Sequence, residues 1–342
     1  METMRLGRTN IIASKSGFGA LPIQRISIED ASILLKKAYD SGINFFDTAR
    51  AYTDSEEKIG YALSEVRNHI TIATKTAAID KKSLFADLET SLKKLKTDVI
   101  DIYQLHNPPE LPDYDDPDGL YQGLLEAKAN GMIRFLGLTN HRLSVAMQAA
   151  RDKKFDTIQF PLSSLSSDED LNLAHLCKEN DIGFIAMKAM SGGLITNAAS
   201  TFAFLRQFDN VLPIWGIQRM RELDEFLSYE KKPPVLDEAL LKIIEQDRDQ
   251  LAGSFCRGCG YCQPCPAQIP IETAARISLL LTRAPYQGFL TDEFKEKMER
   301  INNCTHCNHC KNHCPYGLDT PSLLKHMLEE YNRFYAAHKV NR

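Results

Sequence analysis

The chain has 342 residues, of which 43% are hydrophobic and 25% are charged, and its formal net charge at pH 7 is -4. This size and composition predict a globular protein with a full-sized core and room for a small second domain. The small net charge excludes a strongly basic nucleic-acid-binding protein, and no stretch approaches the roughly 20 apolar residues of a membrane span. We therefore expect a cytoplasmic protein with no nucleic-acid and no membrane partner.

Eight short apolar segments bounded by turn residues lie in the first 230 residues, and each is typical of a strand. They are residues 16–21, 43–48, 70–75, 99–106, 133–140, 157–161, 183–188 and 212–217. Stretches with helical apolar spacing lie between them, at 28–42, 55–66, 83–95 and 168–180. This alternation predicts an α/β fold, and eight units predict a closed (β/α)8 TIM barrel. The alternative, an open doubly wound sheet, would carry GxGxxG after its first strand, which is absent here.

Polar residues stand at or near the ends of five predicted strands. They are Asp47, Lys75, His106, Asn140 and Gln159. Because the active sites of (β/α)8 barrels are built at the carboxyl ends of the strands, we expect these side chains to meet at one mouth of the barrel.

The motifs FFDTARAYTDSEEKIGYAL, ATKT, YQLHNP, GLTNH and PIWGIQRMRELDEFL resemble, in order, the successive motifs of the aldo-keto reductases. The resemblance runs over residues 4 to 230. It implies a catalytic tetrad of Asp47, Tyr52, Lys75 and His106. The substrate would then be a small carbonyl compound or alcohol.

The chemistry of carbonyl reduction gives each of these residues a role. A phenol has a pKa near 10, so release of the Tyr52 proton at neutral pH costs about 4 kcal/mol. A Lys75 ammonium about 4 Å away supplies about 4 kcal/mol in favour of the phenolate at an effective dielectric near 20. Asp47 would hold Lys75 and keep it charged, and His106 would orient the carbonyl oxygen or share the proton transfer.

The resemblance also implies a nicotinamide cofactor. It places Thr139, Asn140 and Gln159 at the carboxamide, and the loop KAMSGGL, with Lys188, Gly192 and Gly193, over the pyrophosphate. Glycines there would let backbone amides approach phosphate.

Arg219 and Arg221 lie where the family binds the adenosine 2′-phosphate, and Glu225 lies where the family contacts adenine. Two arginines favour NADP(H) over NAD(H), because guanidinium matches phosphate in charge and geometry. NAD(H) remains an alternative, since the pattern here differs from the commoner one of Lys or Ser followed by a later Arg.

Two runs, CRGCGYCQPCP and CTHCNHCKNHCP, contain eight of the nine cysteines: Cys256, Cys259, Cys262, Cys265, Cys304, Cys307, Cys310 and Cys314. Triplets at every third position are too close together for mutual disulfides and predict metal sites in a reducing compartment. The ninth, Cys177, lies in a predicted helix and is expected to be a buried apolar residue.

In ferredoxin-type motifs three cysteines of one loop and the cysteine before a proline of the other run hold each cluster. This predicts two 4Fe-4S clusters, one held by Cys256, Cys259, Cys262 and Cys314, and the other by Cys304, Cys307, Cys310 and Cys265. Two four-thiolate zinc sites are the alternative. Only two residues separate Cys262 from Cys265, where the bacterial ferredoxin pattern has three, so Cys265 could reach its cluster differently.

The cysteine-rich region is predicted to be a small α-helical domain, similar to the α-helical dicluster ferredoxins. Its last helix has an apolar face that would pack on the clusters or on the barrel, formed by Leu324, Met327, Leu328, Tyr331 and Tyr335. The predicted organisation is a barrel at 1–232, a linker and helix at 233–255, and a dicluster domain at 256–342.

Three hypotheses for function follow. The first is NAD(P)H-dependent interconversion of a carbonyl and an alcohol, with the clusters linking the site to a ferredoxin-type partner. The second keeps this chemistry and makes the clusters structural or redox-sensing. The third makes the barrel a nucleotide-binding module that regulates an electron-transfer subunit. Hydride carries two electrons at once whereas a cluster passes one at a time, so the connection between the two chemistries is the open question.

Overall fold

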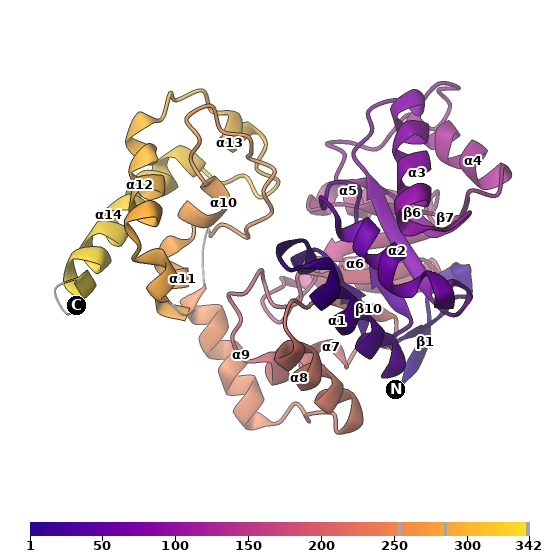
Figure 1. Ribbon diagram of the computed structural model, residues 1–342, viewed down its shortest axis with the longest axis horizontal. Helices are drawn as coiled ribbons and strands as arrows, with labels where there is room; N and C mark the ends of the chain where they lie inside the picture. The colour runs from indigo at the N-terminus through magenta and orange to yellow at the C-terminus, as the bar shows by residue number, and fades with distance from the viewer. Residues whose placement is uncertain (252–254, 284–285, 340–342) are drawn as a thin grey trace. The chain divides into compact units, whose positions relative to one another are not determined.

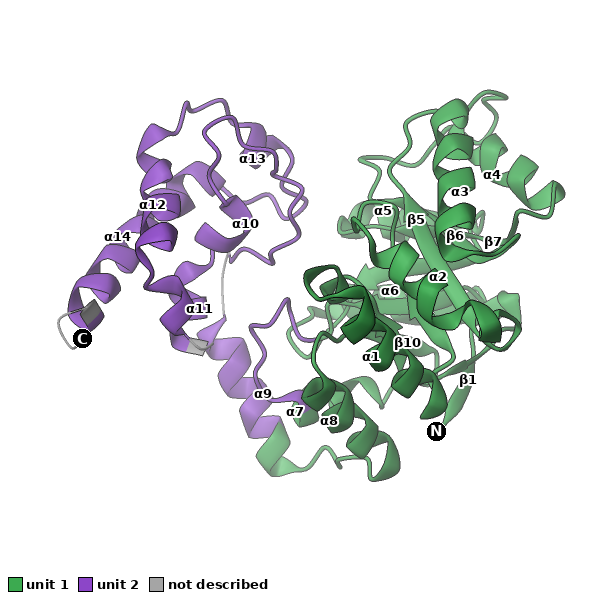
Figure 2. Cartoon of the chain, viewed as in Figure 1, with its two compact units in different colours: residues 1–189, 199–240 green, residues 190–198, 241–342 purple. Residues whose placement is uncertain are grey.

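The computed structural model describes residues 1–251, 255–283 and 286–339, which form two compact units (Figure 2). Unit 1 comprises residues 1–189 and 199–240, and unit 2 comprises residues 190–198 and 241–342. Small parts of the predicted ranges 233–255 and 256–342 lie outside the described residues.

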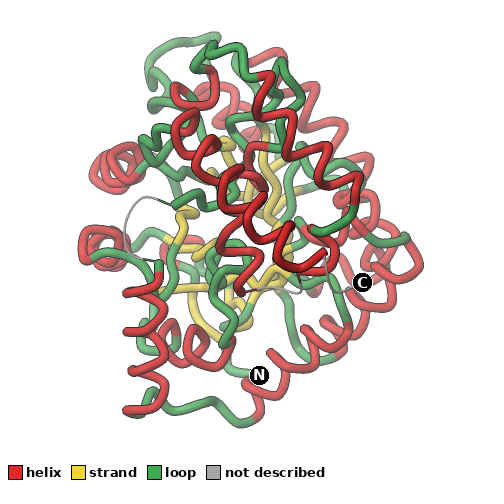
Figure 3. Tube along the Cα trace, turned by 90° about the vertical axis from the view of Figure 1, so that its left-hand side faces the viewer, coloured by secondary structure: helices red, strands yellow, loops and turns green. Residues whose placement is uncertain are grey.

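Unit 1 is built on a closed barrel of eight parallel strands enclosed by helices (Figure 1 and Figure 3). The strands are β3 (Gly17–Gly19), β4 (Phe45–Asp47), β5 (Thr71–Thr76), β6 (Ile100–His106), β7 (Ile133–Thr139), β8 (Thr157–Pro161), β9 (Gly183–Met187) and β10 (Val211–Gly216). Each strand pairs with the next along the chain, and β10 pairs with β3 to close the barrel. The predicted (β/α)8 barrel is confirmed.

One α-helix follows each barrel strand. These helices are α1 (Ile28–Asp40), α2 (Ser55–Leu63), α3 (Lys81–Leu95), α4 (Leu120–Ala129), α5 (Leu143–Asp152), α6 (Asp168–Glu179), α7 (Ala198–Leu205) and α8 (Met220–Lys231). Polar caps fix several helix starts: the Ser27 hydroxyl accepts a hydrogen bond from the backbone N–H of Asp30, and Ser167 and Asp170 cap α6 reciprocally. The last of them, α8, ends two residues before Pro233, as the sequence predicts.

An antiparallel hairpin that the sequence analysis did not identify precedes the barrel. It consists of β1 (Thr3–Arg5) and β2 (Ile12–Ser14). Its apolar residues Met4 and Leu6 are buried in one cluster with Phe45 and Leu212, which are among the first residues of their strands. The hairpin therefore closes the amino-terminal end of the barrel and leaves the carboxyl ends of the strands for the site.

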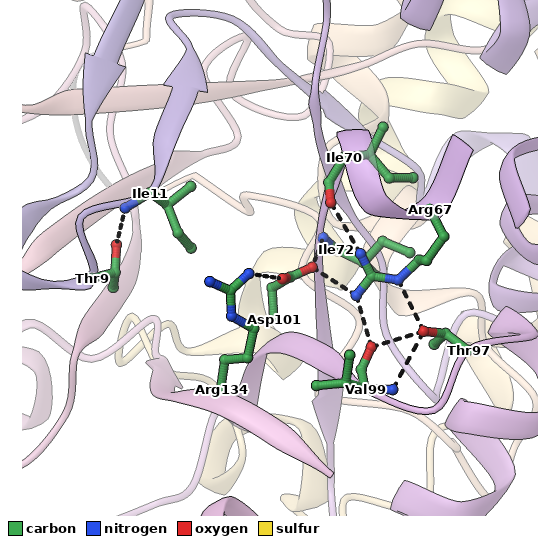
Figure 4. A network of polar contacts seen from close by, with 9 residues as sticks. All are labelled: Thr9, Ile11, Arg67, Ile70, Ile72, Thr97, Val99, Asp101 and Arg134. Atoms are coloured by element: carbon green, nitrogen blue, oxygen red, sulfur yellow. Dashed lines mark hydrogen bonds and ion pairs between the residues drawn. The ribbon is translucent and has the colours of Figure 1, made fainter. Parts of the chain in front are cut away.

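A buried carboxylate organises the amino-terminal ends of three neighbouring strands (Figure 4). Asp101, the second residue of β6, accepts hydrogen bonds from Arg67 at 2.7 Å, Arg134 at 2.9 Å and the backbone N–H of Ile72 at 2.9 Å. A buried charge needs this kind of pairing to offset its lost hydration. This network lies at the end of the barrel where polar residues serve stability rather than catalysis.

Unit 2 is helical in its described residues. Its helices are α9 (Glu238–Gln250), which begins in unit 1, and α10 (Ile271–Ala274), α11 (Ile277–Arg283), α12 (Asp292–Glu299), α13 (His309–Asn312) and α14 (Thr320–Lys339). The five apolar residues predicted to form one face of the last helix are all buried in a single core with Cys262 and Cys310. That face therefore packs within the cluster domain. No helix in the described ranges has both the length and the apolar character needed to cross a membrane.

The division into units differs from the predicted ranges at two places. Within the predicted linker and helix 233–255, residues up to 240 group with the barrel and residues from 241 group with unit 2. Segment 190–198, which lies inside the predicted barrel range 1–232, groups with unit 2. A physical reason is visible in Arg276, whose Nη1 donates a 2.8 Å hydrogen bond to the carbonyl oxygen of Gly192.

Candidate active site and cluster cavities

A buried ion pair forms the centre of the candidate active site. Asp47 is the last residue of β4, and Lys75 lies near the end of the adjacent strand β5. Both side chains are almost fully buried, and Lys75 Nζ donates to Asp47 Oδ1 at 2.8 Å and Oδ2 at 2.7 Å. Lys75 Nζ also donates to the carbonyl oxygen of Thr48 at 2.6 Å. Burial raises the pKa of Asp47 and lowers the pKa of Lys75, and their mutual attraction opposes both shifts.

Two glutamines complete the surroundings of the carboxylate. Gln104 Nε2 donates to Asp47 Oδ1 at 3.4 Å, and Gln159 Nε2 donates to Asp47 Oδ2 at 3.5 Å. Gln104 accepts in turn from the Thr139 hydroxyl at 3.3 Å. The sequence analysis missed Gln104, although it lies two residues before His106 in one strand and therefore shares its face of the sheet.

Tyr52 and His106 meet above the ion pair. Their rings stand edge to face with centroids 5.9 Å apart, and Lys75 Nζ lies 5.3 Å from the centroid of the Tyr52 ring. Tyr52 belongs to the loop between β4 and α2, and His106 is the last residue of β6. Burial, assisted by the Lys75 ammonium, lowers the pKa of His106 to about 3, so its imidazole is neutral at pH 7. The structure thus brings all four residues of the predicted tetrad together.

The polar residues predicted to hold the carboxamide lie beside the tetrad. Thr139 pairs with His106 across the strands β6 and β7, and also with Gln159 across β7 and β8. The next residue, Asn140, uses its side-chain amide to donate to the Pro108 carbonyl oxygen at 2.9 Å, and its oxygen accepts from the backbone N–H of Arg142 at 2.8 Å.

Two buried polar atoms of this region have no hydrogen-bond partner among the described residues: Gln159 Oε1 and Arg142 Nη1. An unsatisfied buried acceptor is costly unless a ligand or water completes it. The open acceptor on Gln159 fits the amide donor of a nicotinamide carboxamide. The residues present are therefore compatible with that cofactor.

The remaining predicted cofactor residues are distributed over two segments. Lys188 follows β9 directly in unit 1, whereas Gly192 and Gly193 lie in segment 190–198 of unit 2. Arg219 caps the start of α8, and Arg221 and Glu225 lie on its exposed face. Glu225 accepts a 2.7 Å hydrogen bond from the hydroxyl of Tyr229. In unit 1, the exposed arginines follow β10 at the carboxyl end of the barrel, as the resemblance implies.

Unit 2 contains two cavities lined by cysteines. The wall of the first contains all four cysteines of the first predicted set, Cys256, Cys259, Cys262 and Cys314. The wall of the second contains all four of the second set, Cys265, Cys304, Cys307 and Cys310. Both cavities share Cys262, Ile271 and Cys310, so they adjoin one another.

The shortened spacing of the first run is accommodated by the side chain of Gln263. Its oxygen accepts from the backbone N–H of Cys265 at 2.9 Å, and its nitrogen donates to the Ile269 carbonyl at 2.8 Å and to the Glu272 carboxylate at 2.7 Å. These bonds fix the turn that directs Cys265 to the second cavity.

Three of the thiols that line the cavities would need a bound group in order to ionise. Burial raises the pKa of Cys256, Cys262 and Cys310. Thiolate ligation would therefore release protons as the group binds. Among the described residues, no three His, Cys, Asp or Glu side chains converge closely enough to hold a single metal ion.

Family models match both parts of the chain. Residues 15–239 match the aldo/keto reductase family, and residues 255–319 match the 4Fe-4S dicluster domain. The second match favours iron–sulfur clusters over the zinc alternative.

Two curated proteins resemble the barrel region. Aldo-keto reductase YhdN of Bacillus subtilis is 29% identical over 219 residues, covering 57% of this chain and 64% of that protein. L-galactose dehydrogenase of Arabidopsis thaliana is 27% identical over 216 residues, covering 57% of this chain and 67% of that protein. The chain therefore spans less than two thirds of the length of the first of these relatives.

Solved structures share the fold of the barrel. An aldo-keto reductase from Bacillus halodurans, in its holo form, superposes with a TM-score of 0.63 at 20% identity, covering 72% of this chain and 96% of that one. An aldo-keto reductase from Klebsiella pneumoniae in complex with NADPH gives a TM-score of 0.62 at 20% identity, covering 72% and 94%. At these identities the likeness shows the fold.

Proposed function

The chain belongs to the aldo/keto reductase family and carries a 4Fe-4S dicluster domain, and on this basis we propose that it interconverts a carbonyl and an alcohol by NADP(H)-dependent hydride transfer. The observation that carries the proposal is the almost fully buried Lys75–Asp47 pair beside the edge-to-face rings of Tyr52 and His106. The nicotinamide, when bound, supplies or accepts the hydride.

The chain's own residues donate the proton to the substrate oxygen and stabilise the charge that develops on it. Tyr52 holds the proton that the oxygen takes as the carbonyl becomes an alcohol. Lys75 favours release of that proton, and Asp47 with its two glutamines fixes Lys75 beneath the ring. His106 is neutral, so it orients the carbonyl oxygen as an uncharged hydrogen-bond donor.

Replacing Tyr52 by Phe tests the catalytic role. We expect Tyr52→Phe to lower kcat about 100- to 10,000-fold, since a positioned general acid contributes on this order, and to leave the affinity for NADPH unchanged. Steady-state assays with candidate carbonyls and nucleotide titrations measure the two quantities. Tyr61→Phe is a matched control, because Tyr61 also has a lysine, Lys96, 5.7 Å from its ring but is exposed on α2. Unchanged turnover in Tyr52→Phe would favour the nucleotide-binding regulatory module instead.

The preference for NADP(H) rests on Arg219 and Arg221 at the start of α8 and on the resemblance to a family whose Klebsiella member is seen with NADPH. Substituting both by Gln should raise KM for NADPH and leave KM for NADH almost unchanged, since only NADPH carries the 2′-phosphate. A parallel rise in both KM values would place the 2′-phosphate elsewhere.

We further propose that the eight cysteines hold two 4Fe-4S clusters, which connect the site to a ferredoxin-type partner. Each cluster, when bound, accepts or gives one electron, so two clusters match the two electrons of one hydride. Anaerobic purification with iron and sulfide analysis tests the cluster number. Stopped-flow mixing tests the electron link. NADPH alone should bleach the cluster absorbance, because its two electrons reduce the two clusters and leave NADP and a proton, and a carbonyl substrate should diminish the bleaching because it takes the same two electrons. Clusters that NADPH does not bleach would favour a structural or sensing role.

A further inference from the structure

Segment 190–198 is a length of chain that belongs to unit 2 yet continues directly from barrel strand β9 into helix α7. Ser191, Gly192 and Gly193 have successive positive φ values of 47°, 68° and 91°. A serine rarely adopts this conformation, and such backbone persists only where the surroundings hold it. Both glycines are exposed, and a Cβ on Gly193 would meet no atom within 4 Å, so a ligand can approach this backbone closely, although the Gly193 N–H already donates to the Met190 carbonyl oxygen at 2.9 Å.

Arg276 is what holds this segment against the first cysteine run. Its Nη1 donates to the Gly192 carbonyl oxygen at 2.8 Å. A Cβ on Gly192 would lie 3.0 Å from Arg276 Nη1 and 3.2 Å from the Arg257 carbonyl oxygen. A Cβ on Gly258 would lie 2.8 Å from Arg276 Cζ. The guanidinium is therefore in close contact with both backbones.

The same guanidinium acts on the first cluster cavity. Gly258 donates its backbone N–H to Cys256 Sγ at 3.4 Å, and Cys256 lines that cavity. The guanidinium of Arg276 thus contacts both segment 190–198 and the first cysteine loop.

We propose that Arg276 couples a phosphate-bearing nucleotide at segment 190–198 to the reduction state of the cluster held by Cys256, Cys259, Cys262 and Cys314. The inference rests on the proposed nucleotide and cluster sites. Reduction adds one electron, and so one negative charge, to the cluster, while the nucleotide brings negative phosphates to the segment. Because the single guanidinium of Arg276 can turn toward only one of these negative groups at a time, a stronger contact with one weakens its contact with the other.

Coupling of this kind is reciprocal. If reduction weakens nucleotide binding by a given factor, the nucleotide must lower the midpoint potential of the cluster by the corresponding amount. A tenfold change in affinity corresponds to about 59 mV for a one-electron centre.

The test uses 2′-phosphoadenosine diphosphoribose, which carries the phosphates of NADP and no nicotinamide, so it cannot exchange hydride. Its affinity for the anaerobic holoprotein is measured by calorimetry in the oxidised and the dithionite-reduced states. The cluster potentials are measured by EPR-monitored titration with and without the analogue. In the wild type we expect the affinity to fall about tenfold on reduction and one cluster potential to fall by about 59 mV.

Four variants separate coupling from a purely structural role. Arg276→Gln should bring the two affinities within about twofold, and Arg276→Lys should keep part of the difference because the charge remains. Arg300→Gln is the matched control, since Arg300 donates to the Gln268 carbonyl oxygen at 3.2 Å beside the second cysteine set and should leave the ratio unchanged. Gly192→Ala is used if Arg276→Gln loses iron. Its new Cβ disturbs the contact between Gly192 and Arg276, so it should also reduce the ratio of the two affinities.

Equal affinities in the two states of the wild type would overturn the inference alone. The inference would also be overturned if Arg276→Gln kept the wild-type ratio of the affinities in the oxidised and reduced states. If Arg276→Gln loses iron, the same result in Gly192→Ala would overturn it. Failure of the analogue to bind either state would overturn the proposed nucleotide site and this inference with it.

Discussion

At the scale of single residues, burial decides what each charge in the barrel contributes. Lys75 and Asp47 are joined by two hydrogen bonds of 2.7 to 2.8 Å with almost no exposure. Lys178 and Asp209 are joined by two bonds of 2.7 Å, but their side chains are 53% and 71% exposed. Water stabilises each charge of the second pair alone, whereas the first pair depends on its partner.

This contrast gives a matched pair of substitutions. Lys75→Met leaves Asp47 buried and unpaired and should destabilise unit 1 by about 3 to 5 kcal/mol. Lys178→Met should cost about 1 kcal/mol or less. Guanidinium unfolding followed by the fluorescence of Trp215, the only tryptophan, reports on the barrel, because Trp215 is buried in β10. Similar losses in the two variants would contradict a special role for burial.

His106 should make the stability of the barrel depend on pH. Its pKa is about 3 in the folded protein and 6.5 as an ordinary histidine, so between these values the unfolded chain binds the proton and the folded chain does not. Its contribution is therefore complete above pH 6.5 and declines as the pH falls, by up to about 2 kcal/mol at pH 5. His106→Gln should flatten the pH profile of Trp215-monitored unfolding between pH 7.5 and 5. An unchanged slope would show that another group is responsible.

At the scale of elements, the barrel separates stability from chemistry between its two ends. The hairpin β1–β2 closes the amino-terminal end, and the Asp101 network ties three strands there. The tetrad occupies the carboxyl ends of β4, β5 and β6 and the loop that follows β4. Substitutions in the hairpin should therefore change stability without changing the site.

Leu6 and Ile12 provide the test. Leu6 is fully buried and packs against the backbone of Gly183, whereas Ile12 is 56% exposed. Leu6→Ala should lower the free energy of unfolding by about 2 to 5 kcal/mol, and Ile12→Ala should change it by less than about 0.5 kcal/mol. The kcat of both variants, assayed well below the unfolding temperature, should match the wild type. A fall in kcat for Leu6→Ala would show that the hairpin also shapes the site.

At the scale of the whole molecule, the proposed crossed ligand sets would tie the two cysteine runs into one structure. Cys314 lines the first cavity although it belongs to the second run, and Cys265 lines the second cavity although it belongs to the first. In the proposed ligand sets each run takes its fourth thiolate from the other, and Cys262 and Cys310 line both cavities.

The crossing predicts which cysteine variants behave alike. Cys314→Ala should lose the same EPR signal as Cys256→Ala, and Cys265→Ala the same signal as Cys304→Ala, each with roughly half the iron, since one of two clusters is affected. Cys177→Ala is the control, because Cys177 is buried in α6 of the barrel. If Cys314→Ala instead resembled Cys304→Ala, each run would hold its own cluster.

The sequence predicted the parts of this protein that depend on local pattern. Alternating apolar segments identified the eight strands, because buried parallel strands need continuous apolar runs. Gln104 was missed, because its function depends on which strand lies beside it. The hairpin was missed as well, because its apolar residues become meaningful only against the barrel that they close.

By itself, the sequence determined the order of the strands, the residue types of the tetrad and the eight thiols, since spacing along the chain specifies these. Only the tertiary structure decided that the imidazole of His106 is neutral and that segment 190–198 is held by Arg276, which lies 84 residues from Gly192 along the chain in the same unit. Both depend on burial and charge contributed by residues distant in sequence, and such effects exist only once the chain has folded.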